Sequence, residues 1–93
     1  MKVRELFTDA SKWTQGPSAK QSDGTPCSEY SAEACSWCLA GAINKCYDDI
    51  PTAHKVNIKE TLSQTLGMHF IDWNEEPNRT FEEVKALVEK ADV

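Results

Sequence analysis

Apolar residues recur along much of this chain at spacings of three and four positions, the pattern of helices that bury one face. In residues 2–13 this pattern forms one apolar stripe with charged residues between its members: Val3, Leu6, Phe7, Ala10 and Trp13. A second stripe begins after Thr80 and consists of Phe81, Val84, Leu87, Val88 and Ala91. Thr80 and Glu83 have the spacing of a capping box, which marks a helix start. Both segments are therefore predicted to be amphipathic helices.

Residues 31–47 are uncharged along most of their length and built largely from small side chains. Their apolar positions again follow steps of three and four: Cys35, Cys38, Leu39, Ala42, Ile43 and Cys46. We expect this segment to form a central helix with neighbours close on more than one side, and Ser31 to be its N-cap. Gly41 in mid-helix costs roughly 1 kcal/mol relative to alanine. Its presence indicates that another backbone approaches closely at this point.

The remaining segments complete the predicted fold. A third helix starts at Thr52 and ends before Gly67, a residue suited to the left-handed conformation that terminates helices. The stretch after it reads as a short extended or turning segment anchored by Phe70, Ile71 and Trp73. Residues 14–30 are polar and are predicted to be one long irregular loop, with Asp23-Gly24 as the tip of a hairpin-like excursion. The predicted fold class is all-α, a single helical domain over residues 1–93 with about four helices bundled around residues 31–47.

The length and the net charge of the chain exclude some classes of protein. A chain of 93 residues suits one core, and its net charge of −5 argues against a nucleic-acid surface. No apolar run approaches the twenty residues of a membrane span, and the charged start lacks a signal-peptide core, so we expect a cytoplasmic protein. Residues 55–93 carry eight acidic and five basic residues. This excess either serves solubility or attracts a basic partner.

The four cysteines stand at positions 27, 35, 38 and 46. In a helix, Cys35 and Cys46 lie about 16.5 Å apart, too far to share one zinc ion with bonds of about 2.3 Å. One alternative stays open, a zinc site that uses Cys27, Cys35 and Cys38 with His54 or His69. The favoured interpretation is that the cysteines are small buried hydrophobes. We predict no metal, no cofactor and no catalytic residue.

Two of the three tryptophans stand at the ends of predicted elements beside polar side chains. Aromatic rings beside convergent polar groups are typical of ligand pockets and interface hot spots. The candidate binding residues are Trp13, Gln15, Trp73, Asn74 and Arg79. Arg79 would clamp a carboxylate or phosphate with its planar fork, or alternatively pair with Glu75 or Glu83. Both halves of this set come together if the loop after Trp13 folds back onto residues 73–80.

Three motifs follow one another in the chain: W-T-Q-G-P-S-A (13–19), A-C-S-W-C-L-A-G-A-I (34–43) and F-I-D-W-N-E-E-P-N-R-T-F-E-E-V (70–84). Together they resemble an uncharacterised family of short bacterial and phage-encoded proteins, catalogued as a domain of unknown function. The resemblance spans residues 6–91 and departs at Glu75, where the family more often has aspartate. Three of the cysteines (Cys27, Cys35 and Cys46) do not belong to the family pattern. The resemblance implies no known activity.

Three classes of function are consistent with these observations. The first and preferred is a non-enzymatic protein-interaction or regulatory module of bacterial or phage origin, which binds another protein through its acidic side. The second is a small-molecule binding protein or enzyme that takes an anionic ligand in a Trp/Asn/Arg-lined pocket. The third is a metal or redox protein that uses the cysteines.

Overall fold

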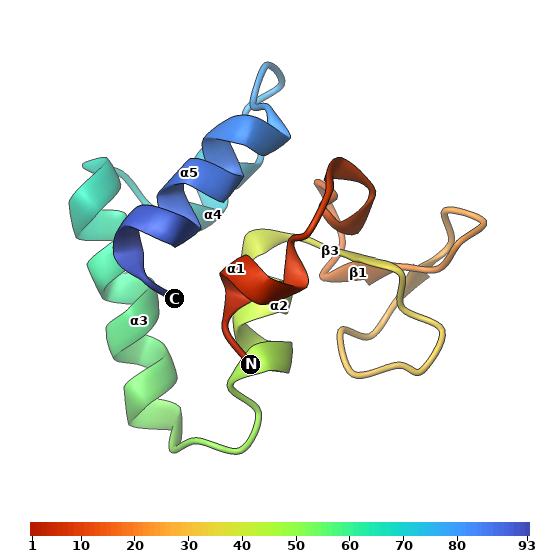
Figure 1. Ribbon diagram of the computed structural model, residues 1–93, viewed down its shortest axis with the longest axis horizontal. Helices are drawn as coiled ribbons and strands as arrows, with labels where there is room; N and C mark the ends of the chain where they lie inside the picture. The colour runs from red at the N-terminus through yellow and green to blue at the C-terminus, as the bar shows by residue number, and fades with distance from the viewer.

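The computed structural model describes residues 1–93 as a mixed fold, in which helices adjoin a small antiparallel sheet (Figure 1). The α-helices are α1 (Val3–Leu6), α2 (Leu39–Cys46), α3 (Thr52–Leu66), α4 (Phe70–Asn74) and α5 (Phe81–Ala91). The three strands, in the spatial order β2-β1-β3, are β1 (Ala19–Lys20), β2 (Pro26–Cys27) and β3 (Ser36–Trp37). The prediction of an all-α helical bundle is therefore wrong. None of the helices combines the length and the hydropathy that a membrane-spanning segment needs.

The central helix is much shorter than the predicted 31–47 segment, because Ser36 and Trp37 form a strand of the sheet and residues 31–35 before them are not helical. Trp37 pairs with Ala19 across β3 and β1, and the Cys35 backbone N–H donates to the Lys20 carbonyl at 2.8 Å. Backbone groups that bond to a strand are not available to a helix. α2 starts only after Cys38, and Ser31 is not its N-cap.

The N-cap of α2 is Cys38, whose Sγ accepts a hydrogen bond from the Gly41 backbone N–H at 3.3 Å. A Cβ atom on Gly41 would lie 2.1 Å from the Ser18 carbonyl oxygen. The same carbonyl accepts the Cys38 backbone N–H at 3.1 Å. The predicted close approach of another backbone to Gly41 is confirmed, and that backbone is the chain just before β1.

The segment 14–30 is not one irregular loop, since it contains β1 and β2. These strands pair antiparallel around a turn in which Gly24 has φ +87°, so the predicted hairpin tip at Asp23-Gly24 is confirmed. Each strand has two residues, too few for the alternation of apolar and polar side chains that announces a strand in a sequence.

The predicted first helix, 2–13, is broken into α1 and η1 (Ala10–Lys12), a 3-10 helix. Asp9 interrupts the helical ladder, because its carboxylate accepts the Ser11 backbone N–H at 2.9 Å and caps η1. Of the apolar stripe, Val3 and Phe7 are fully buried, Leu6 and Trp13 are half-buried, and Ala10 is exposed. α1 also contacts the other end of the chain, where the Arg4 backbone N–H donates to the Val93 carbonyl at 3.1 Å.

The second half of the chain follows the prediction more closely. α3 begins at Thr52, and Gly67 ends it with φ +73° in the left-handed region. The capping box of α5 is confirmed by hydrogen bonds in both directions between Thr80 and Glu83. The stretch after Gly67, predicted to be extended or turning, instead contains the short helix α4.

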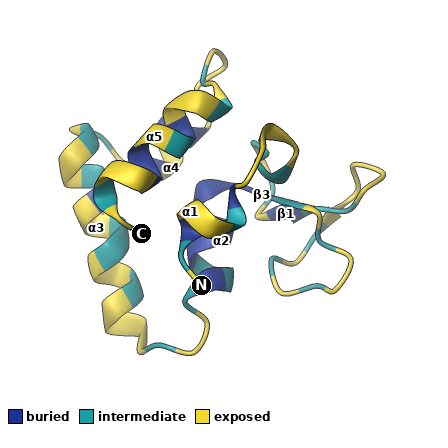
Figure 2. Cartoon of the chain, viewed as in Figure 1, coloured by how far each residue is buried: buried dark blue, intermediate teal, exposed yellow.

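One hydrophobic cluster holds these elements together. Its 15 buried residues are Val3, Phe7, Ala19, Trp37, Leu39, Ala42, Ile43, Cys46, Leu62, Phe70, Trp73, Val84, Leu87, Val88 and Val93. All five α-helices and two of the three strands contribute buried residues, yet α3 contributes only Leu62. Figure 2 shows the consequence, since most of the surface of α3 is exposed while α2 and the inner faces of α4 and α5 are buried.

Candidate functional site

The structure brings the predicted binding residues together at the C-terminal end of α4. The Trp13 indole Nε1 donates to Asn74 Oδ1 at 2.8 Å. Gln15 Nε2 donates to the backbone carbonyls of Asn74 at 2.8 Å and of Glu76 at 2.7 Å. The chain after Trp13 therefore folds back onto residues 73–80, as the sequence suggested.

Asn74 is the hub of this arrangement and is only 2% exposed. Its Oδ1 also accepts the Leu39 backbone N–H at 3.2 Å, which ties it to the first residue of α2. Its Nδ2 donates to Glu75 Oε2 at 2.6 Å, and Glu75 Oε1 accepts the Gly16 backbone N–H at 2.5 Å. We call Trp13, Gln15, Asn74 and Glu75 the Asn74 cluster. The polar ends of its four side chains are bonded to groups of the same chain.

Arg79 and Trp73 form a second contact beside the Asn74 cluster. The guanidinium carbon lies 3.9 Å from the centroid of the Trp73 ring, and Nε donates to the Trp73 carbonyl at 3.0 Å. Nη1 and Nη2 form ion pairs with Glu83 at 2.7 Å and Glu76 at 2.9 Å. The alternative in which Arg79 pairs with Glu83 is therefore the observed one. Binding of a ligand or partner by these residues stays a prediction.

These bonds affect the acidity of Glu83. Its pKa is held below the usual value, chiefly by the hydrogen bond from the Thr80 backbone N–H, and further by the Thr80 hydroxyl and Arg79. The carboxylate is thus stabilised in its charged form by the helix cap and the guanidinium together. Glu83 serves the start of α5 and the position of Arg79.

A small cavity of about 190 Å³ lies next to the Asn74 cluster. Its walls are formed by Gly16, Ser18, Cys38, Ala40, Ile71, Asn74 and Glu75. Ligand pockets usually measure about 300–1,000 Å³, so this space suits only a very small molecule. Burial raises the pKa of the Cys38 thiol, which keeps it protonated and poorly nucleophilic. Cys38 thus acts here as the helix cap of α2.

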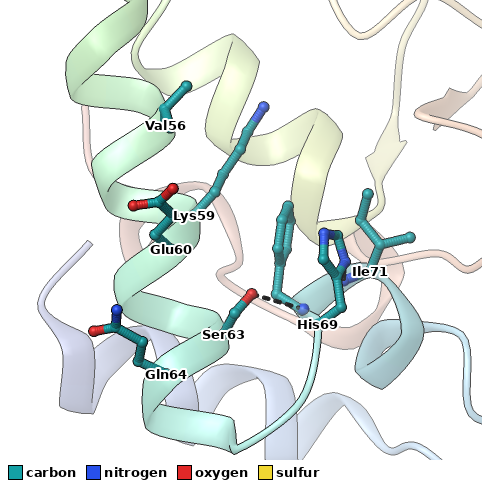
Figure 3. A pocket seen from close by; sticks show the side chains of 8 residues that line it. Val56, Lys59, Glu60, Ser63, Gln64, His69 and Ile71 are labelled. Atoms are coloured by element: carbon teal, nitrogen blue, oxygen red, sulfur yellow. Dashed lines mark hydrogen bonds between the residues drawn. The ribbon is translucent and has the colours of Figure 1, made fainter.

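A larger hollow, the α3–α4 groove, separates α3 from the start of α4 (Figure 3). Its volume is about 660 Å³, and its lining residues are Val56, Lys59, Glu60, Ser63, Gln64, His69, Phe70 and Ile71. Val56 and Ile71 are each 45% exposed. The other large hydrophobic side chains with such exposure are Met1 and Tyr30. Two of the four exposed apolar side chains therefore meet at one groove.

Several polar groups of the groove are engaged in holding its walls. Ser63 Oγ accepts the Phe70 backbone N–H at 3.0 Å, and His69 Nδ1 accepts the Ile71 backbone N–H at 3.3 Å (Figure 3). The Lys59 ammonium donates to Asn44 Oδ1 on α2 at 2.9 Å. Neither Lys59 nor Glu60 forms an ion pair, so the lining of the groove carries one positive and one negative charge.

The sequence analysis missed this groove. Ile71 was predicted to be an apolar anchor, whereas the structure places Ile71 and Val56 at the surface. A signal was present in the low apolar content of α3, whose fifteen residues include only Val56, Ile58, Leu62 and Leu66 as large apolar side chains. Which of these four face the core depends on how α4 packs, and the sequence does not contain that information in any local pattern.

The four cysteines are free thiols. Cys38 and Cys46 are buried, in agreement with the interpretation as small hydrophobes, whereas Cys27 is half-buried and Cys35 is exposed. Burial raises the pKa of Cys46 to about 11. No three side chains among the histidines, cysteines and carboxylates come together in a geometry that would hold a metal ion.

The comparisons with known proteins place the chain in a family and supply no activity. A model described as "Family of unknown function (DUF6197)" matches residues 1–92. The match confirms the resemblance to a family of unknown function. Comparison with curated proteins and with solved structures gives no match.

Proposed function

The chain belongs to this family of unknown function, and we propose that it acts as a non-enzymatic interaction module that binds another protein through the α3–α4 groove. The observation that carries this proposal is the exposure of Val56 and Ile71 on one hollow surface. Each square ångström of apolar surface withdrawn from water contributes about 25 cal/mol, and exposed apolar groups gathered at one place mark interaction sites.

The character of α3 supports the same conclusion. It is the longest helix of the molecule, and Leu62 is its only fully buried side chain. A helix that buries so little of itself gains little stability from its own core contacts. A partner seated in the groove would cover Val56 and give α3 the apolar contact that the chain alone does not provide.

The polar groups of the groove favour binding over chemistry. Nucleophilic catalysis needs a hydroxyl or thiol within hydrogen-bond reach of a base. In the groove, the Ser63 hydroxyl and the His69 ring instead accept backbone N–H groups at the start of α4. Their bonds hold the groove in shape, which is the role of polar residues beneath a docking surface.

Charge indicates which partner the groove would take. The chain carries a net charge of −5, and its acidic excess lies in residues 55–93. At the groove, Glu60 on α3 forms no ion pair. Lys59, the basic lining residue, directs its ammonium to Asn44. Because Lys59 balances Glu60 in the lining, the preference for a partner segment with lysine or arginine rests on the net negative charge of the whole chain.

The test uses a photo-crosslinking amino acid, benzoylphenylalanine, in place of Gln64, an exposed residue of the groove. The control carries it at Tyr30, in the loop between β2 and β3, which lies on the opposite side of the molecule from α3 (Figure 1). Irradiation in a lysate of the cells that encode the chain should crosslink the Gln64 variant alone. Mass spectrometry should identify a segment of another protein rich in apolar and basic residues.

That segment, synthesised as a peptide, should bind the purified chain at low salt and more weakly at high salt. Ile71→Ser should raise the dissociation constant at least tenfold, and Tyr30→Ser should leave it unchanged. The proposal fails if Gln64 crosslinks only to a second copy of this chain, if its crosslinks match those of the Tyr30 control, or if Ile71→Ser does not weaken binding.

A further inference from the structure

We propose that the peptide bond between Asp23 and Gly24, at the tip of the β1–β2 hairpin, is a site of spontaneous backbone modification that the folded hairpin holds in check. The modification converts aspartate into isoaspartate, so that the main chain continues through the side-chain carbon Cγ. The groups that react all belong to these two residues and to water. The site is separate from the α3–α4 groove, which is lined by other elements.

Asp23 is the one aspartate of the chain that precedes a glycine. The residues that follow the other aspartates are Ala10, Asp49, Ile50, Trp73 and Val93. A side chain on the following residue crowds the nitrogen that must attack the carboxyl group, whereas glycine has no Cβ. Isomerisation of this chain is therefore expected to be fastest at Asp23.

The conversion takes two steps that balance without an oxidant or reductant. First, the Gly24 nitrogen bonds to Asp23 Cγ, and the amide proton leaves with the carboxyl hydroxyl group as one water molecule. This closes a five-membered succinimide ring. Water then adds to the Asp23 main-chain carbonyl carbon, and the bond from that carbon to the Gly24 nitrogen breaks. The product is isoaspartate, which has the same mass as the original chain.

Neighbouring side chains do not block this reaction at the hairpin tip. Residues 22–26 are exposed, and the turn projects from the rest of the molecule (Figure 1). A Cβ atom on Gly24 would have no other atom within 4 Å. Water therefore reaches the site, and any restraint on ring closure comes from the hydrogen bonds of the turn.

Two hydrogen bonds of the folded turn oppose ring closure. Asp23 Oδ1 accepts the Thr25 backbone N–H at 2.9 Å, which fixes the carboxylate. The Gly24 N–H donates to the Gln21 carbonyl at 3.0 Å, which retains the proton that the attacking nitrogen must lose. Thr25, through its backbone N–H and then its hydroxyl, also lowers the pKa of Asp23. An ionised carboxyl group has no hydroxyl to release as water, so it cyclises poorly.

These restraints last only while the hairpin is closed. The Gln21 backbone N–H donates to the Thr25 carbonyl at 2.8 Å and closes the turn, and Ala19 anchors β1 in the core, where it is fully buried. Unfolding breaks these contacts and frees the Asp23 carboxyl group and the Gly24 nitrogen to meet. The unfolded chain should therefore form isoaspartate at Asp23 at least fivefold faster than the folded chain.

The test incubates the full chain at neutral pH, folded in sodium chloride and unfolded in guanidinium chloride of equal concentration. After removal of the salts, methylation by an isoaspartyl methyltransferase counts the isoaspartate, and peptide mass spectrometry with electron-transfer fragmentation locates it. Asp23→Ser is the control, because it keeps an oxygen acceptor for the Thr25 N–H and lacks the carboxyl group. In this variant, methylation should stay at the level of freshly purified protein in both salts.

The site and its protection by the hairpin are tested separately. If the unfolded chain forms isoaspartate chiefly at another aspartate, or forms none, the assignment to Asp23 is wrong. If the folded and unfolded chains form it at Asp23 at the same rate, the hydrogen bonds of the turn do not protect the site. Equal methylation of the wild type and Asp23→Ser would also overturn the assignment.

Discussion

The Asn74 cluster and the α3–α4 groove are both built on α4, and they differ in what their side chains contact. In the cluster, Asn74 bonds to Trp13, Leu39 and Glu75, and little of it reaches water. In the groove, Val56 and Ile71 are apolar yet nearly half exposed. The polar groups of the cluster form hydrogen bonds that join the segment at Trp13, the start of α2 and the end of α4. The groove instead leaves apolar side chains exposed to water. A concentration of aromatic and polar residues is thus a good sign of a structural joint, and uncovered apolar surface is the better sign of a binding site.

Among the residues of the cluster and the groove, the largest effect on stability is expected from Asn74→Ala. This change removes the acceptor of the Trp13 indole and of the Leu39 backbone N–H, and an unsatisfied buried donor costs about 1–3 kcal/mol. We expect a loss of about 2–5 kcal/mol, seen as a fall of more than about 10 °C in Tm. Asn78→Ala, at an exposed position four residues later, is the matched control. Equal stability of both variants would show that the cluster is not a structural joint.

Gly41→Ala should have the second largest effect and lower the free energy of unfolding by about 1–3 kcal/mol. The added methyl group would overlap the Ser18 carbonyl. Whether Gly41→Ala lowers or raises the stability distinguishes two explanations. Helix propensity alone predicts that alanine stabilises this position by about 1 kcal/mol. Urea unfolding measures the difference, and a stabilised variant would contradict the close approach of the two backbones.

A smaller effect, on the pH dependence of stability, is expected from Glu83→Gln. The pKa of Glu83 is lowered in the folded chain. Because the folded pKa lies below the unfolded value of about 4.3, this carboxylate stabilises the fold at higher pH. That contribution is lost as the pH falls through the folded pKa. Stability measured between about pH 5 and pH 3 should fall less steeply for Glu83→Gln than for the wild type. Glu82→Gln, an exposed neighbour in the first turn of α5, should keep the wild-type slope.

The smallest effect on stability is expected in the groove. Ile71→Ser changes a side chain that is already 45% exposed, so the free energy of unfolding should stay within about 0.5 kcal/mol of the wild type. The same variant should lose partner binding, as argued above. Leu62→Ser on the neighbouring helix should instead unfold the chain, because Leu62 is fully buried. A large loss of stability in Ile71→Ser would assign Ile71 to the core and remove it from the docking surface.

The sequence predicted helix ends correctly where a capping residue or a glycine marks them. Thr80 with Glu83 marked the start of α5, and Gly67 marked the end of α3. Local patterns failed where long-range pairing overrode them. Residues 31–38 have the small side chains of a buried helix, yet Trp37 pairs with Ala19 in a sheet of two-residue strands. The predicted binding residues show the same division, because the sequence grouped Trp13, Gln15 and Asn74 but not their mutual hydrogen bonds. The groove was not predicted, and binding by either set stays a prediction.

The sequence by itself determined where α5 starts, where α3 ends, and that Gly41 required a close neighbour. Composition, helix caps and single glycines express these properties within a few residues of chain. Only the tertiary structure decided that Ser18 is that neighbour, that Asn74 joins three segments, and that Val56 and Ile71 are left at the surface. Each of these depends on contacts between residues far apart in the chain, which the packing of the core sets and no local pattern records.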